Sequence, residues 1–409
     1  MVADSPLSPL LAAVPQPTAE IRLASIDAYR GFVMLLMMAE IVHLPSLADR
    51  FPNSPFWQAV KFHTTHVEWA GCSLHDLIQP SFSFLVGVAL PFSLAARAAR
   101  GHSLGRMFGH ALWRGLLLTF LGVFLRSVGR SRTNFTFEDT LSQIGLGYLL
   151  LFLLGLRARW VQIVALAAIL VGYWGLFAVY PLPGPEFDYA AVGADAEWRS
   201  QHGYRGFAAH WNKNSNPAWA FDTWFLNLFP REAPFRHNGG GYATLSFLPT
   251  LATMILGLLA GGLLRESWTA HKKLAWLAVA GAACLAFGWA LDYFAICPSV
   301  KRIWTPAWVL FSGGWCYLFL AGFYWLLDAS GWQKLALPLA VIGANSIAIY
   351  CLVHLIDRFI VESFRTHLGQ EAFHVLGADY EPQLAGLAAL AAFWLLLFWM
   401  YRRRIFIRV

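Results

Sequence analysis

Long apolar runs separated by short polar stretches dominate the chain. Each run is long enough to cross the hydrocarbon core of a bilayer, which takes about 20 residues of α-helix. The runs lack the alternation of β-strands and are about twice the length of a barrel strand. The pattern therefore predicts an all-α, polytopic integral membrane helix bundle with about ten transmembrane helices. The expected helices lie at 29–46, 77–96, 107–126, 141–156, 160–180, 244–264, 274–294, 306–327, 335–355 and 384–401.

Two polar segments differ from the short connections. The first 20 residues hold four prolines and no Lys or Arg, so we expect 1–24 to form a disordered cytoplasmic tail. Residues 25–409 then make one transmembrane domain with a long extracytoplasmic loop at 182–243. This loop is rich in Trp, Asn, His and Gly, which suits either carbohydrate recognition or an aromatic belt at the membrane interface.

Positive charges are distributed unevenly between the polar stretches. If the N-terminus is cytoplasmic, 15 Lys and Arg fall in the inside segments and nine in the short outside loops. Cytoplasmic loops carry the excess of positive charge. We therefore expect both termini in the cytoplasm.

Composition agrees with a membrane protein. Hydrophobic residues make up 58% of the 409 positions and charged residues only 13%, against about 25% in soluble domains. The net charge of +7 lies in clusters between the apolar runs, as topology markers do, so no nucleic-acid partner is expected.

Several polar residues fall inside the apolar runs, where they usually mark function, ion pairing or a water-filled cavity. Glu40 and His43 lie late in the first run, and Asn345 and Ser346 lie in the ninth. A histidine satisfied by a backbone carbonyl and a hydrogen bond between helices are the structural alternatives for these positions.

The segment from His63 to Pro80 holds the strongest local constellation. His66 offers an imidazole, and Asp76 offers a carboxylate ten residues later, at the entrance to a helix. Imidazole can accept a proton from an amine, or attack a thioester and carry the acyl group. A carboxylate on its other nitrogen fixes the tautomer and stabilises the cation. The alternative is an interfacial loop in which both residues cap a helix or meet water.

Several stretches resemble motifs of one enzyme family. Ser25–Gly31 is similar to Ser-Leu-Asp-x-x-Arg-Gly, and His66–Leu77 to His-x-x-Trp-x-Gly-x-Thr-x-x-Asp-Leu. Residues 248–261, 303–306 and 343–347 add weaker matches. The chain thus resembles the catalytic domain of the heparan-alpha-glucosaminide N-acetyltransferase family and its bacterial relatives, within the transmembrane acyltransferases.

The resemblance implies an acetyl-CoA-dependent N-acetyltransferase of the bacterial inner membrane. It would move an acetyl group to the amine of a terminal glucosamine-type sugar on the extracytoplasmic side. His66 would be the acetyl carrier or general base, with Asp76 as its partner. Glu40 is a further catalytic candidate. The family has an asparagine near the end of this helix, and the present sequence has Glu40, Ile41 and His43 there instead. The expected substrate-binding residues are Trp69, Asn345, Ser346, Trp304 and His43.

Acetyl-CoA is the expected co-substrate, and no metal is expected. Arg30, Arg97 and Arg106 lie on the cytoplasmic side, where their charges suit the phosphates of CoA. For Arg30, an ion pair with Asp27 is the structural alternative. The expected partners are the lipid bilayer and an amino-sugar or glycan acceptor, with a homodimer as a further option.

Two other functions stay open. The Asp-x-x-Arg-Gly motif at 27–31 is also similar to the acyltransferase-3 proteins, which implies O-acetylation of a cell-envelope polysaccharide. A small-molecule transporter is the second alternative, with Glu40, Asp292 and Asn345 along a substrate path. Transporters often show inverted repeats and broken helices, and the sequence shows neither clearly.

Overall fold

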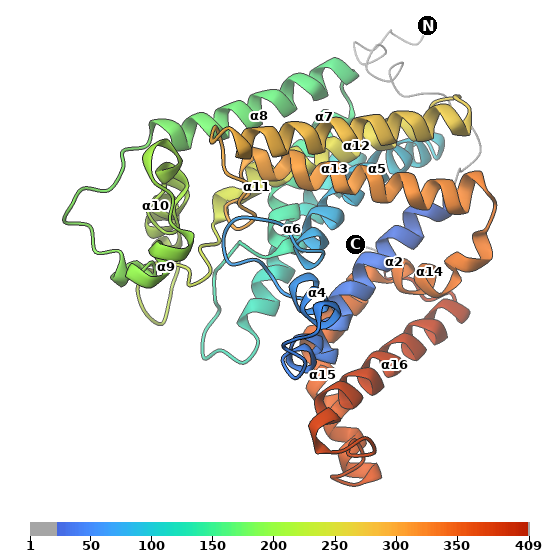
Figure 1. Ribbon diagram of the computed structural model, residues 1–409. Coiled ribbons are helices and arrows are strands. Elements are labelled where there is room, and N and C mark those ends of the chain that lie inside the picture. Colours follow the sequence, from blue (N-terminus) through green and yellow to red (C-terminus); the bar gives the residue numbers. More distant parts are fainter. Residues whose placement is uncertain (1–22, 408–409) are drawn as a thin grey trace, which may run out of the picture. The chain divides into compact units, whose positions relative to one another are not determined.

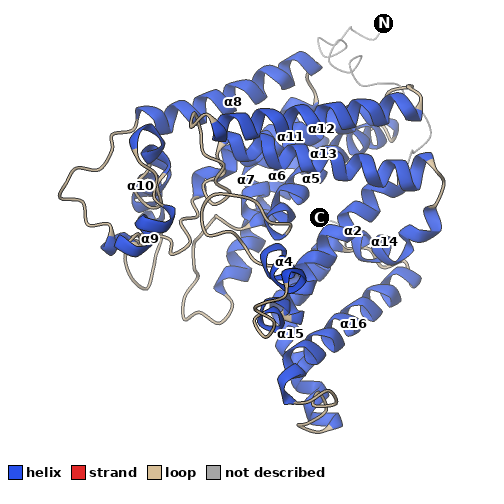
Figure 2. Cartoon of the chain, viewed as in Figure 1, coloured by secondary structure: helices blue, strands red, loops and turns tan. Residues whose placement is uncertain are grey.

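The computed structural model describes residues 23–407, and their regular structure is helical (Figure 2). Extended pairing in this range is limited to an isolated antiparallel bridge between Ala70 and Val300. The all-α prediction is therefore confirmed. The expected disordered tail, 1–24, lies outside the described residues except for its last two, and the first helix already begins at Ala24.

The membrane-spanning character is also confirmed. Between residues 23 and 407, seven helices are long and apolar enough to cross a membrane, and a bent pair makes an eighth. The remaining two expected spans correspond to the shorter helices α2 (Ala24–Met38) and α7 (Thr140–Gly155). The seven are built on α5 (Ile78–Ala99), α6 (Leu104–Ser127), α8 (Arg159–Val179), α11 (Phe247–Leu264), α12 (Ala270–Tyr293), α13 (Pro306–Phe323) and α16 (Glu381–Arg402).

The first expected helix, 29–46, has different bounds. Helix α2 ends at Met38 and a 3-10 helix, η1, follows over Ala39–Val42. His43 then adopts a left-handed conformation with φ of 53°, and α3 (Leu44–Ala48) begins with a proline in its first turn. Proline suits the start of a helix but not its interior, so the chain turns here. Glu40 consequently lies in a tight turn and not on a long helix.

The ninth expected helix, 335–355, is broken. Helices α14 (Leu337–Ala344) and α15 (Ser346–Leu368) meet at Asn345 with a bend of 62°. The Asn345 amide donates to the carbonyl oxygen of Ile405 at 3.0 Å and accepts from the Ile407 N–H at 2.9 Å. The side chain that interrupts the helix therefore holds the C-terminal segment, an arrangement that the hydrophobic pattern alone does not indicate.

The described chain divides into two compact units. Unit 1 comprises 68–71 and 82–321, and unit 2 comprises 23–67, 72–81 and 322–407. In unit 1 the central helix is α11, which packs against α7 and α8. Its Gly257 lies so close to α5 that a Cβ there would meet the Phe84 carbonyl oxygen at 1.9 Å. Only glycine permits this approach of the two backbones.

In unit 2, α2 packs against α14 (Figure 1). Helix α16 packs against η1. The Asp328 carboxylate accepts the N–H groups of Ala24 and Ser25 at 3.0 and 3.1 Å. Negative charge at a helix N-terminus is favourable, which explains why α2 begins there. A Cβ on Gly386 would meet the Ile41 carbonyl oxygen at 2.1 Å, so this glycine lets α16 lie directly against the turn that carries Glu40.

The expected loop 182–243 is folded. It contains α9 (Ala196–His202) and α10 (Pro217–Phe225) and belongs to unit 1. Trp211 is fully buried, and its carbonyl oxygen accepts from the Trp69 indole at 3.2 Å. The amides of Asn212, Asn214 and Asn216 bind backbone groups of the same loop. These aromatic and amide side chains therefore build a packed subdomain.

Candidate active site

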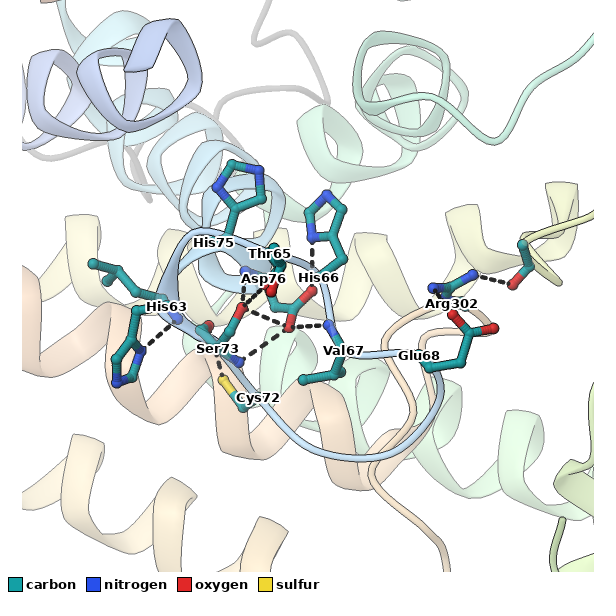
Figure 3. A network of polar contacts seen from close by, with 12 residues as sticks. His63, Thr65, His66, Val67, Glu68, Cys72, Ser73, His75, Asp76 and Arg302 are labelled. Carbon is teal, nitrogen blue, oxygen red and sulfur yellow. Dashed lines mark hydrogen bonds and ion pairs between the residues drawn. The ribbon is translucent and has the colours of Figure 1, made fainter. Parts of the chain in front are cut away.

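A histidine and an aspartate form the centre of the candidate site, in the segment between α4 (Pro55–His63) and α5 (Figure 3). The Nδ1 atom of His66 lies 2.9 Å from Oδ1 of Asp76. The Asp76 side chain is fully buried, whereas the His66 side chain is 41% exposed. The pair thus has a buried carboxylate end and an accessible imidazole end.

Neighbouring donors fix the Asp76 carboxylate. Its Oδ2 accepts from the N–H groups of Val67 at 3.2 Å and Ser73 at 3.0 Å, and lies 2.9 Å from the Ser73 hydroxyl. These donors precede Asp76 in the chain, so the bonds order the loop that carries His66. They do not cap the following helix, which was the alternative for this aspartate. The other oxygen, Oδ1, is directed at the imidazole.

This geometry selects one tautomer of His66. An ionised carboxylate only accepts hydrogen bonds, so the neutral imidazole that faces it carries its proton on Nδ1. The basic nitrogen of the ring is then Nε2. It can take a proton from an attacking amine or attack a thioester carbonyl, which are the two roles predicted for this histidine.

A second histidine–carboxylate pair lies beside the first. Nε2 of His75, in the short helix η2 (His75–Leu77), lies 3.0 Å from Oε1 of Glu40. The His66 and His75 rings are 4.5 Å apart between centroids, at 49°. The structure therefore brings together three predicted catalytic residues, His66, Asp76 and Glu40. His75 was missed, although it directly precedes Asp76 in the matched stretch.

Glu40 also lines a cleft of about 840 Å³ in unit 2, a volume typical of small-molecule sites. The walls come from the turn after α2 and from α15 and α16. Aliphatic side chains make one part of the lining, and ionisable groups make the other. The ionisable residues are Glu40, His43, His354, Asp357, Arg358, Glu362, Arg365 and Glu381.

The predicted cofactor-binding residues belong to different units. Arg97 and Arg106 lie in unit 1, around the connection from α5 to α6. Burial, and then the charges of Arg106, Arg97 and Arg100, lower the pKa of His102 in this connection. Both predicted arginines therefore contribute to one basic region.

Arg30, the third predicted cofactor ligand, lies in unit 2. Its guanidinium is 3.4 Å from the Asp27 carboxylate, one helical turn earlier. The ion pair with Asp27, which is the structural alternative to CoA binding by Arg30, is therefore present. A role of Arg30 in binding CoA stays a prediction.

The predicted substrate-binding residues differ in whether their side chains are buried or line the cleft. Trp69 and Trp304 are almost fully buried, and the Trp304 indole donates to the Thr253 hydroxyl at 3.1 Å. Substrate contact would require both indoles to leave these positions, and would require Asn345 to release the C-terminal segment. His43 lines the cleft with Glu40, whereas Ser346 begins α15. Their roles in binding stay predictions.

Among residues 23–407, no group of three or more His, Cys, Asp or Glu is arranged to hold a metal ion.

Fold and site together define a multi-pass helical membrane protein with an exposed histidine held by a buried aspartate. The chain is similar to heparan-alpha-glucosaminide N-acetyltransferase from Homo sapiens, at 22% identity over 430 residues, and from Mus musculus, at 20% over 427. The alignments cover 95% of this chain, which spans about 60% of the length of these curated relatives. No protein-family model matches the chain. The expected resemblance is thus confirmed as a distant one.

Proposed function

We propose that the chain is a membrane-embedded acetyltransferase that moves an acetyl group from acetyl-CoA to the amine of a glucosamine-type sugar on the extracytoplasmic side. The observation that carries this proposal is the contact of 2.9 Å between His66 and Asp76. It gives an accessible imidazole a fixed tautomer, as the aspartate does for the histidine of the Ser-His-Asp acyl-transfer triad. The distant similarity to the N-acetyltransferases supports the same reaction class.

In the direct reaction, Nε2 of His66 takes a proton from the amine while the nitrogen attacks the thioester carbonyl carbon. The tetrahedral intermediate then collapses, the carbon–sulfur bond breaks, and the CoA thiolate leaves with the bonding electrons. Asp76 stabilises the imidazolium that forms. In the covalent variant, the same Nε2 attacks the thioester carbonyl carbon and CoA leaves as the thiolate; the amine then displaces the imidazole from the acetyl group, and the freed Nε2 takes the amine proton. Both routes use the same nitrogen.

Thiol release tests the proposal. Purified protein with acetyl-CoA should release free CoA in the presence of glucosamine and should yield the N-acetylated sugar by mass spectrometry. Product from a sugar that offers only hydroxyl groups would instead support O-acetylation of an envelope polysaccharide. If neither kind of acceptor causes CoA release, the acetyltransferase proposal is wrong.

A small-molecule transporter is the second candidate, favoured by the helix break at Asn345 and by the cleft that Glu40 lines. Broken helices are common in transporter sites. Reconstituted vesicles separate the two functions: a transporter would accumulate substrate without acetyl-CoA, whereas an acetyltransferase would modify it only when acetyl-CoA is supplied.

The basic region around His102 leads to a prediction about CoA. Replacing Arg97 or Arg106 by Ala should raise the Kd for acetyl-CoA by about fivefold or more for each, because a charged contact to phosphate contributes roughly 1 kcal/mol. Titration calorimetry measures this change. Arg130→Ala, which removes an exposed arginine from another connection of unit 1, is the matched control. Unchanged Kd values in both variants would contradict the assignment of this region to CoA.

The charge distribution leads to a prediction about topology. We expect both termini in the cytoplasm and 182–243 on the extracytoplasmic side of the inner membrane. An epitope inserted at Gly184, an exposed position with open space around it, should be reached by antibody in spheroplasts without detergent. A C-terminal epitope should need permeabilisation. The reverse result would overturn this orientation.

A further inference from the structure

The proposed reaction leaves a proton to be removed. A neutral amine and acetyl-CoA give an amide, the CoA thiolate and one proton, so each turnover leaves on His66 the proton that it took from the amine. Nδ1 of His66 already holds a proton against Asp76. A proton collected by this ring therefore has to leave from Nε2, and the groups near the ring decide its route.

The second pair lies where such a route would begin. The His75 ring is 4.5 Å from the His66 ring, and its Nε2 is 3.0 Å from Glu40. The His75 side chain is only 10% exposed, whereas that of Glu40 is 53% exposed. Glu40 also lines the cleft of about 840 Å³. The series His66, His75, Glu40 thus runs from the candidate base, through a mostly buried imidazole, to a carboxylate in an open cleft.

We infer that His75 and Glu40 carry the proton released at His66 out into this cleft. The inference rests on the proposed acetyltransferase function. His75 takes the proton on Nδ1, directly or through one water molecule, and becomes an imidazolium beside the Glu40 carboxylate. Its Nε2 proton then passes to Glu40 and from there to water in the cleft. The ring regains its first tautomer by exchange with water, so no oxidant or further reactant is needed.

Other charged groups face Glu40 and bear on this route. His66 and His354 both interact electrostatically with the Glu40 carboxylate. The same cleft is also lined by Asp357 and Arg358 of α15 and by Glu381 of α16. Arg365 holds Glu362 and Glu381 at 3.0 and 2.7 Å, so these two carboxylates are already paired. Glu40 is the cleft carboxylate that contacts a histidine next to His66.

Glu40→Gln tests the relay, because glutamine can still accept the hydrogen bond from His75 but cannot carry the proton. We expect kcat to fall by roughly tenfold or more, with an unchanged Kd for acetyl-CoA and unchanged Tm. Small weak acids such as formate, or imidazole buffer, should restore turnover in a concentration-dependent way, because the cleft is open to them. His75→Gln should show the same loss, and Glu371→Gln, which changes an exposed carboxylate of unit 2 outside the cleft, should show neither loss nor rescue.

The outcomes separate the two proposals. If the wild-type protein transfers acetyl groups and Glu40→Gln transfers them equally fast, the relay is wrong and the acetyltransferase proposal stands. Loss of turnover without rescue by buffer would make the pair a structural support for the turn at η1, and would also overturn the relay. If the wild-type protein transfers no acetyl group, both proposals fail together.

Discussion

His66→Ala should lower acetyl transfer by about 10²–10⁴-fold, while the protein still binds acetyl-CoA with nearly normal Kd. The expected loss follows because the substitution removes Nε2 of His66. This is the ring nitrogen that can act as base or nucleophile while Nδ1 is bonded to Asp76. Because the truncation removes the Nδ1 donor of the buried Asp76 carboxylate, the melting temperature should fall, and turnover is therefore compared at a temperature at which the variant is folded. Steady-state kinetics and calorimetry on the same preparation measure both quantities.

His63→Ala is the matched control, a second histidine of the same segment. His63 accepts only a long bond of 3.3 Å from the Leu74 N–H at an exposed position, so turnover should change by a few-fold at most. Wild-type protein incubated with acetyl-CoA alone distinguishes the two roles of His66. A bound acetyl group found by mass spectrometry, and missing in His66→Ala, identifies a carrier. Near wild-type turnover in His66→Ala would remove His66 from the reaction.

Asp76→Asn should lower turnover by a similar factor with the fold preserved. The amide oxygen of Asn can accept from the Val67 and Ser73 N–H groups, which turns its NH₂ group toward His66. An NH₂ group donates, so Nδ1 of His66 must become the acceptor and the proton moves to Nε2. The ring then has the wrong tautomer for taking a proton or attacking a thioester. The same substitution in the Ser-His-Asp triad costs about 10⁴-fold.

Asp76→Ala gives the contrast that isolates this effect. It leaves the donors of Val67 and Ser73 without their buried acceptor, at about 1–3 kcal/mol for each unsatisfied group, so its melting temperature should fall. Thermal unfolding and kcat for the two variants separate structure from chemistry. Full turnover in Asp76→Asn would make Asp76 a structural residue and leave the tautomer of His66 to other groups.

The sequence predicted best the features that are formed by residues close together in the chain. His66 and Asp76 are ten residues apart in one loop, and the motif that contains them fixes both. The apolar runs likewise predicted the helices, because bilayer thickness sets their length. The pair of His75 and Glu40 was not predicted, since it joins residues 35 positions apart across a turn that depends on the approach of α16 at Gly386. The break at Asn345 depends in the same way on the C-terminal segment.

The bonds described for Asp76 all lie within residues 66–76. Contacts this close in sequence close small loops, which cost little chain entropy. These bonds therefore place the histidine and its aspartate within one short segment of the chain. The cleft, in contrast, takes its walls from α15 and α16. Substitutions in these two helices would therefore change the lining of the cleft and leave the bonds within residues 66–76 in place.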